Sequence, residues 1–289
     1  MFLYPKFYKM RKIFFTLFLA LPFLMNAQLV KTLKKTIELK MPGIAVPSKV
    51  TGEDSLPGKR GGAVAWHPIQ KKYYAAFAGN YSFPLAVFDA AGKRLSDKDQ
   101  TCLVDTRGIW YNPKLKKICG NGYDDIGWFS YTLDAKGIPA EAEIYAAGMN
   151  QPGEQSVGVF NTKTNMVYFL YGQNVYLYNA EAMQEEDSSI RLHPGISKKE
   201  NIDADNDGTV LSEDYSYNVL IYTGIPKAEF GLLNVMENQV ELYNKKTGLL
   251  TQKLKLPADL PTWPAFNFSY ANGTYWAFDQ ETRIWTGYK

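Results

Sequence analysis

Short runs of alternating hydrophobic and polar residues recur along this chain, and each run leads into a turn. The clearest runs reach Trp66-His67-Pro68, Tyr111-Asn112-Pro113, Phe160-Asn161-Thr162, Tyr222-Thr223-Gly224 and Tyr270-Ala271-Asn272. Alternation with a period of two residues is typical of β-strands. Self-similarity at a period of about 45–50 residues is typical of repeated sheet units. The pattern therefore predicts an all-β protein with the architecture of a β-propeller.

Further strands follow each of these runs. In the first unit, residues 63–66, 72–78 and 84–89 form successive strands, and a Gly after the third strand closes a turn that begins at Asp89. Asp starts such turns through side-chain hydrogen bonds, and Gly adopts the positive φ that they need. The aligned aromatic residues are 45, 49, 62 and 48 positions apart. We expect five four-stranded blades, with an insertion near residues 196–214 in the long interval. A degenerate sixth blade is the alternative.

The last unit lacks one strand. It offers strands at residues 266–271, 274–279 and 283–289, and residues 37–44 resemble the segments 190–196 and 253–257 that we interpret as fourth strands elsewhere. We therefore expect the N-terminal strand to complete the C-terminal blade. Such closure removes the unpaired edges of the sheet.

The first 27 residues have the parts of a secretory signal peptide. Arg11 and Lys12 form a basic start, residues 13–25 are almost wholly apolar, and Ala27 is a small residue at which cleavage can occur. The apolar stretch is shorter than the roughly 20 residues that span a bilayer. We expect residues 1–27 to be removed and residues 28–289 to form one periplasmic or extracellular domain without a transmembrane segment. An uncleaved anchor is the alternative.

Composition argues against a nucleic-acid partner and is compatible with one disulfide bond. The whole chain has 32 Lys+Arg and 29 Asp+Glu, and four of the basic residues lie in the leader, which leaves 28 against 29. A nearly neutral domain is not expected to bind nucleic acid. An exported chain meets an oxidising compartment, where Cys102 and Cys119 could form a bridge. Two buried, unbridged thiols are the alternative.

In this pattern of strands and turns the chain resembles secreted bacterial β-propellers of the broad WD40/YVTN kind. The resemblance covers residues 35–289, but the Trp-Asp dipeptide of true WD40 repeats is absent. It implies the fold and no particular activity. Propellers of this kind often serve as binding platforms whose partners dock at a mouth of the central channel.

An acidic loop within the insertion has the spacing of a calcium-binding loop. Asp203, Asp205 and Asp207 occupy alternate positions, Gly follows at the sixth position, and Asp214 stands at the twelfth. Ca²⁺ takes six to eight oxygen ligands, which such a loop can supply, with Thr209 contributing its backbone carbonyl. The loop is therefore a candidate calcium site, whose role would be structural. A solvated turn rich in Asp is the alternative.

Charged residues gather in loops that the propeller topology brings to one face. These are the loops that precede the first strands and those that follow the second strands, and they contain Arg60, Asp105, Arg107, Asp124, Asp125 and Glu154. Converging polar groups at a channel mouth form the default ligand site. Solvated loop tips or internal Arg–Asp pairs are the alternative. The opposite face carries lysines in hairpin turns, which we interpret as solubilising residues.

These features predict a non-catalytic module that binds a protein, peptide or glycan at one mouth. The only two histidines, His67 and His193, occupy turn positions of the repeat, and the chain has no phosphate-binding loop or catalytic-triad motif. One alternative is a carbohydrate-active hydrolase or lyase that uses Asp124, Asp125 and Glu154. A structural envelope protein is the other.

Overall fold

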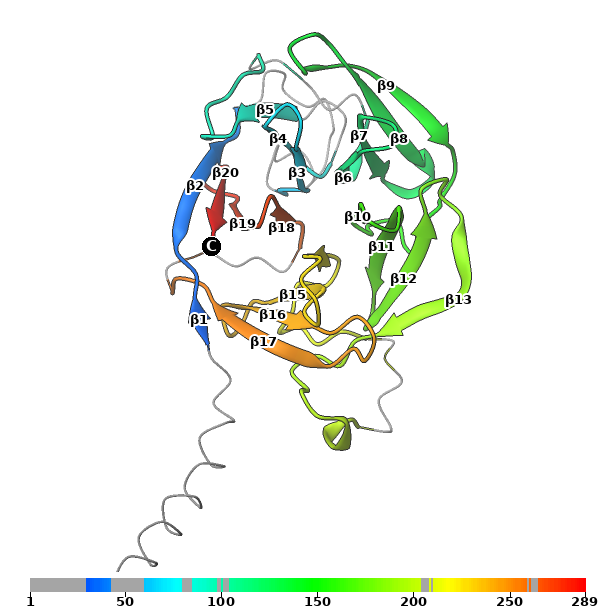
Figure 1. Ribbon diagram of the computed structural model, residues 1–289, viewed down its shortest axis with the longest axis vertical. Coiled ribbons are helices and arrows are strands. Elements are labelled where there is room, and N and C mark those ends of the chain that lie inside the picture. Colours follow the sequence, from blue (N-terminus) through cyan, green and yellow to red (C-terminus); the bar gives the residue numbers. More distant parts are fainter. Residues whose placement is uncertain are drawn as a thin grey trace, which may run out of the picture.

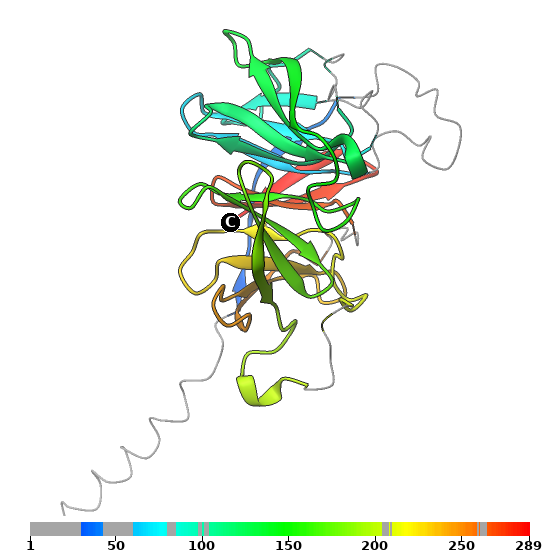
Figure 2. The ribbon, with the colours of Figure 1, turned by 90° about the vertical axis from the view of Figure 1, so that its right-hand side faces the viewer.

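The computed structural model describes residues 30–42, 60–79, 85–97, 100, 104–203, 208, 210–258, 260 and 265–289, except for the side chains of residues 186–188. Five sheets stand around a central axis as the blades of a ring (Figure 1), and a view from the side shows their strands stacked around it (Figure 2). The prediction of an all-β, five-bladed propeller is confirmed. Among the described residues, no helix is long and apolar enough to cross a membrane.

Three blades contain four antiparallel strands that follow one another along the chain. Blade 2 consists of β6 (Thr106–Asn112), β7 (Lys117–Gly122), β8 (Trp128–Leu133) and β9 (Pro139–Ala146). Blade 3 consists of β10 (Val159–Asn161), β11 (Met166–Tyr171), β12 (Asn174–Asn179) and β13 (Gln184–Arg191). Blade 4 consists of β14 (Ile221–Tyr222), β15 (Phe230–Asn234), β16 (Gln239–Tyr243) and β17 (Leu250–Lys255). The fourth strand of blade 3 thus lies earlier than the predicted 190–196, because its polar residues conceal the alternation.

Blade 1 has a different outer edge. Its regular strands are β3 (Val64–His67), β4 (Lys72–Ala76) and β5 (Leu85–Asp89). Among the described residues no fourth strand follows. Instead, an irregular segment forms hydrogen bonds with backbone groups at the outer edge of β5. The Val87 N–H donates to Ser96 Oγ at 3.0 Å, and the Leu95 N–H donates to the Val87 carbonyl at 2.7 Å. A side chain here replaces a backbone partner, which keeps the edge satisfied.

The N-terminus closes the ring. Blade 5 consists of β18 (Phe268–Ala271), β19 (Thr274–Asp279) and β20 (Ile284–Tyr288), and β2 (Lys35–Lys40) pairs antiparallel with β20 as the fourth strand. This confirms the predicted closure within residues 37–44, of which 43 and 44 lie outside the described residues. The short strand β1 (Lys31–Thr32) was not predicted, and it pairs parallel with β17 in blade 4. The N-terminal segment therefore joins two blades.

Aromatic side chains fill the space between neighbouring blades. Ring centroids lie 5.1 Å apart between Tyr73 and Trp276, which joins blades 1 and 5. They lie 5.7 Å apart between Trp128 and Phe169, which joins blades 2 and 3. Edge-on and tilted ring pairs at these distances stabilise sheet packing beyond their buried area. The high aromatic content of the chain thus serves the core.

The insertion between β13 and β14 is anchored by a buried carboxylate. Glu241 of β16 is 1% exposed, and its Oε2 accepts hydrogen bonds from the Gly195 N–H at 3.2 Å and the Tyr215 hydroxyl at 3.0 Å. The Tyr243 hydroxyl donates to the same oxygen at 2.6 Å. Gly195 and Tyr215 lie at opposite ends of the insertion, which contains the 3₁₀ turn η4 (Lys199–Asn201). A buried charge needs several partners, and here those partners fix the loop to blade 4.

Candidate binding rim

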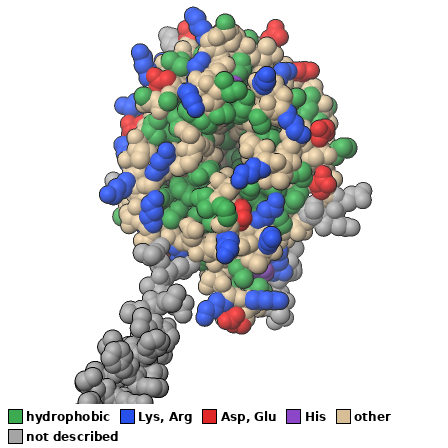
Figure 3. All heavy atoms as spheres, in the orientation of Figure 1, with side chains coloured by type: hydrophobic (Ala, Val, Ile, Leu, Met, Phe, Trp, Pro, Cys, Tyr) green, Lys and Arg blue, Asp and Glu red, His purple; other side chains and the backbone are tan. Residues whose placement is uncertain are grey.

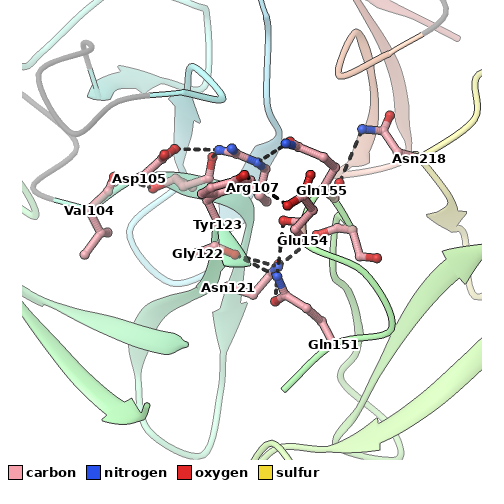
Figure 4. A network of polar contacts seen from close by, with 12 residues as sticks. Val104, Asp105, Arg107, Asn121, Gly122, Tyr123, Gln151, Glu154, Gln155 and Asn218 are labelled. Atoms are coloured by element: carbon pink, nitrogen blue, oxygen red, sulfur yellow. Dashed lines mark hydrogen bonds and ion pairs between the residues drawn. The ribbon is translucent and has the colours of Figure 1, made fainter. Parts of the chain in front are cut away.

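The predicted ligand residues lie together at one end of the ring. We call the loops between blades and the loops after second strands at this end the polar rim. It brings together Asp105 and Arg107 of blade 2 with Glu154 before blade 3 (Figure 4). Arg60, before blade 1, is near enough to Asp105 to act on its charge. Asp124 and Asp125 belong to the single 3₁₀ turn η3 (Asp124–Ile126) that follows β7. The loops thus converge at one end of the ring, as the strand pattern predicts.

Arg107 is committed to internal contacts. The register of β6 against β7 shifts between Thr106 and Gly108, and such a bulge re-aims the side chain of the extra residue. The guanidinium donates from Nη1 to Asp105 Oδ1 at 2.5 Å and from Nε to Gln155 Oε1 at 2.9 Å. Arg107 is only 3% exposed. It therefore organises the rim from beneath, by holding blade 2 to the loop that precedes blade 3.

Aromatic rings and burial set the electrostatics around Arg107. Its guanidinium carbon lies 4.5 Å from the ring centroid of Tyr123 and 5.6 Å from that of Phe266, distances typical of cation–π contacts. Burial lowers the pKa of Arg107, and Asp105 opposes that shift. Burial likewise raises the pKa of Asp105, against the opposite effect of Arg107. Each of these buried charges needs the other to offset its removal from water. We therefore expect that replacing either residue would leave the other as an unpaired buried charge.

A second set of contacts positions the acidic side of the rim. The Tyr123 hydroxyl donates to Glu154 Oε2 at 3.0 Å, and this hydrogen bond raises the pKa of Tyr123. The Asp124 N–H donates to the Glu154 carbonyl at 3.3 Å. Asn121, which is fully buried, donates to Gln151 Oε1 at 2.8 Å and thereby supports the same loop. Glu154 is exposed while its loop is held in place.

A groove of about 730 Å³ runs beside these carboxylates. Large side chains stand exposed along it: Met149 is 53% exposed, Tyr171 54%, Tyr217 56% and Val210 72%. Asp124 and Glu154 are its charged residues, and none of its lining residues is Lys or Arg. The sequence prediction missed the four large side chains. The signal that could have indicated them is the presence of bulky apolar residues in rim loops, where polar residues are expected.

The calcium prediction and the disulfide prediction fall partly outside the described residues. Asp203 and Asp214 line one cavity of about 260 Å³, together with Arg191 and His193. Asp205, Asp207 and Thr209 lie outside the described residues, within which no group of three or more His, Cys, Asp or Glu is placed to hold a metal ion. Cys119 is buried and forms no disulfide with any described residue, and Cys102 lies outside that set. Both predictions therefore stay open.

The fold and the rim define a five-bladed β-propeller with a polar mouth. The crystal structure of Myxococcus xanthus glutaminyl cyclase is similar to it, with 7% identity and a TM-score of 0.52, over 90% of this chain and 96% of that chain. Two more distant structures are a nidogen/laminin complex (13% identity, TM-score 0.38, 66% and 62% covered) and Kuenenia stuttgartiensis hydrazine synthase (10%, 0.41, 78% and 82%).

At 7% identity the similarity to the glutaminyl cyclase shows a common fold alone. No profile of a known protein family matches the sequence, and no curated protein sequence matches it either. The resemblance to WD40/YVTN propellers therefore holds at the level of the propeller fold and extends to no family. Because one fold supports unrelated functions, the function has to be argued from the rim itself.

Proposed function

We propose that this protein is an exported binding module whose polar rim takes up a peptide segment with basic and apolar side chains. The observation that supports this most is the groove beside Glu154 and Asp124, in which exposed apolar side chains stand next to carboxylates. Contiguous exposed apolar groups on a soluble domain mark interaction surfaces. The carboxylates would pair with Lys or Arg of the peptide, and charge complementarity of this kind provides specificity and a fast association rate.

Two properties of the rim favour binding over hydrolysis. A glycosidase needs one carboxyl group kept protonated near neutral pH, usually by burial in an apolar pocket. Glu154 and Asp125 are both exposed to water, and Asp124 is half-buried. The buried charges of the rim, Asp105 and Arg107, are paired with each other. A glycan is a second candidate ligand, because the exposed rings of Tyr171 and Tyr217 could stack on the apolar faces of sugars.

Export is part of the proposal. It rests on the leader at residues 1–27, which lies outside the described residues, and on the expected cleavage after Ala27. Cleavage there leaves Gln28 only three residues before β1, so the mature chain retains both N-terminal strands that join blades 4 and 5. Sequencing the N-terminus of protein recovered from outside the cytoplasm should find Gln28 first. A mature chain that retains residues 13–25 would instead indicate an uncleaved anchor.

The experiment that tests the binding function is a selection of random twelve-residue peptides displayed on phage. We expect enrichment of peptides that combine Lys or Arg with large apolar residues. Their affinity, measured by fluorescence anisotropy, should fall about tenfold with Glu154→Gln or Tyr217→Ala, a loss of roughly 1.4 kcal/mol for each. The control is Lys246→Ala, in a hairpin turn at the opposite end. Enriched peptides that bind all variants equally would contradict the proposal.

A further inference from the structure

The end of the ring opposite the polar rim opens into the central channel. A cavity of about 500 Å³ is bounded there by the inner strands of all five blades. One aromatic side chain from each blade, at the same position of the repeat, borders the cavity: Trp66, Tyr111, Phe160, Tyr222 and Tyr270. Figure 3 looks onto this end, where hydrophobic side chains gather around a central hollow and Lys and Arg lie farther out. Its size and lining are those of a small-molecule site.

Buried residues from three blades contact one another at the rim end of the channel. Arg107 lies at the bulge near the rim end of β6, while Asn218 and Phe266 precede β14 and β18 on the same side. These three residues are at most 5% exposed, and the Asn218 side chain accepts a hydrogen bond from the Phe266 N–H at 3.4 Å. None of the three lines the channel cavity, whose lining shares no residue with that of the groove. A ligand in the channel would therefore not compete with one in the groove.

Polar side chains in the wall of the cavity form hydrogen bonds within the protein. Ser269 Oγ accepts from the Val64 N–H at 3.0 Å and donates to the Val64 carbonyl at 3.3 Å. Asn161 donates to the Tyr168 hydroxyl at 3.1 Å. Burial raises the pKa of Tyr222 to about 12, so its ring is neutral at neutral pH. The wall thus offers apolar ring faces for stacking and presents no negative charge.

One donor in the wall lacks a partner. The hydroxyl oxygen of Tyr111 is buried and has no hydrogen-bond partner among the described residues, while its residue borders the cavity. A buried polar group left unsatisfied costs stability, and in a native structure it often indicates an absent water or ligand. Because this oxygen is itself closed off from the cavity, the hydroxyl belongs to the interior of the wall and takes no part in ligand contact.

The hairpin turns around the mouth carry positive charge. Exposed lysines stand in the turns that follow the first strands of four blades: Lys71, Lys114, Lys116, Lys163 and Lys227. Lys163 itself lines the cavity. In these turns the one carboxylate is Glu229, which accepts hydrogen bonds from the backbone N–H groups of Lys227 and Lys245 at 3.0 Å each. Positive charge at the mouth favours an anion and would repel a cation.

We propose that this channel mouth is a second binding site, which takes a small organic anion with a planar aromatic body. The aromatic side chains around the cavity contact the planar body of the ligand, and Lys163 pairs with its negative group. The site is independent of the peptide-binding groove, because the two open at opposite ends of the ring.

Isothermal titration calorimetry with 2-naphthoate tests this site. We expect one molecule to bind per chain, and the neutral 2-naphthylmethanol and cationic 2-naphthylmethylammonium to bind at least about tenfold more weakly. Lys163→Ala should weaken binding by about 2–5-fold, the range for an exposed ion pair, whereas Tyr111→Phe removes a hydroxyl that is closed off from the cavity and should not weaken it. Phe160→Leu removes a ring but leaves an apolar side chain of moderate size, and it should also weaken binding.

Two controls make the outcome decisive. Lys246→Ala removes a lysine of the same end that does not line the cavity, and Tyr217→Ala alters the groove; both should bind 2-naphthoate like the wild type. The melting temperature of each variant shows that the fold is retained. The absence of binding heat with wild type at millimolar 2-naphthoate would overturn the proposal. Equal binding of the cationic analogue, or binding by both Lys163→Ala and Phe160→Leu that equals that of the wild type, would also overturn it.

Discussion

Closure of the ring by the N-terminal strand can be tested at Leu39. This residue is fully buried in β2, pairs in register with Trp285 of β20, and belongs to the apolar cluster between blades 5 and 1. Leu39→Ala removes three buried carbon atoms, which is worth about 2.4 kcal/mol at about 0.8 kcal/mol per methylene. The cavity left behind adds to this, because the surrounding rings relax only partly. We expect a loss of about 3–4 kcal/mol in the free energy of unfolding.

The loss can be measured by urea unfolding followed through tryptophan fluorescence, since Trp276 and Trp285 lie in the same cluster. In a domain of this size, a loss of 3 kcal/mol corresponds to a fall in melting temperature of about 6–12 °C. The matched control is Lys40→Ala, the exposed next residue of β2, which should change stability by no more than about 0.5 kcal/mol. If Leu39→Ala cost less than about 1 kcal/mol, β2 would not be a packed strand of blade 5.

Three further predictions concern single groups. Glu241→Ala leaves the Tyr215 and Tyr243 hydroxyls without their acceptor and should cost about 3–5 kcal/mol, whereas the exposed Glu237→Ala should cost less than about 0.5 kcal/mol; equal urea midpoints would contradict this. Burial and Lys72 lower the pKa of His67, so stability should fall as the pH drops below about 6.5 and the unfolded chain takes up the proton. Because burial and Arg191 also lower the pKa of His193, His67→Asn should reduce this loss between pH 7.5 and 5.5 without abolishing it, and an unchanged loss would refute the assignment. Calorimetry should detect calcium binding to the wild type and none to the double variant Asp203→Ala/Asp207→Ala, and the absence of heat with the wild type would exclude the loop as a calcium site.

Features fixed by local hydrogen bonding could be predicted from the sequence. Asp89 Oδ1 accepts from the N–H groups of Ala91 and Lys93, as the recurring Asp/Asn turns predict. His67 Nδ1 accepts from the Gln70 N–H at 3.3 Å, much as Asn112 Oδ1 accepts from the Lys114 N–H at 3.0 Å, so this histidine does serve a turn. Such contacts span a few residues, and their residue types indicate them directly.

Features that depend on packing between blades could not be predicted. The fourth strand of blade 1 is replaced by a segment in which the Ser96 hydroxyl substitutes for a backbone acceptor, and no periodicity shows this. The groove forms only because Met149 and Tyr217 of two separate loops meet Tyr171 at the end of β11. Arg107 could be placed on the rim from its position in the repeat, but its burial follows from a β-bulge and from Gln155 of the next loop.

The central claim is that the polar rim binds a peptide in its groove. Hydrogen exchange of the wild-type protein, with and without a peptide selected on it, tests this most directly, because backbone protection reports each loop separately. The account predicts added protection in residues 149–156, 171–172 and 210–218, and none in the hairpin turns at residues 162–165 and 223–229. Protection confined to those turns, or spread over no particular loop, would contradict it.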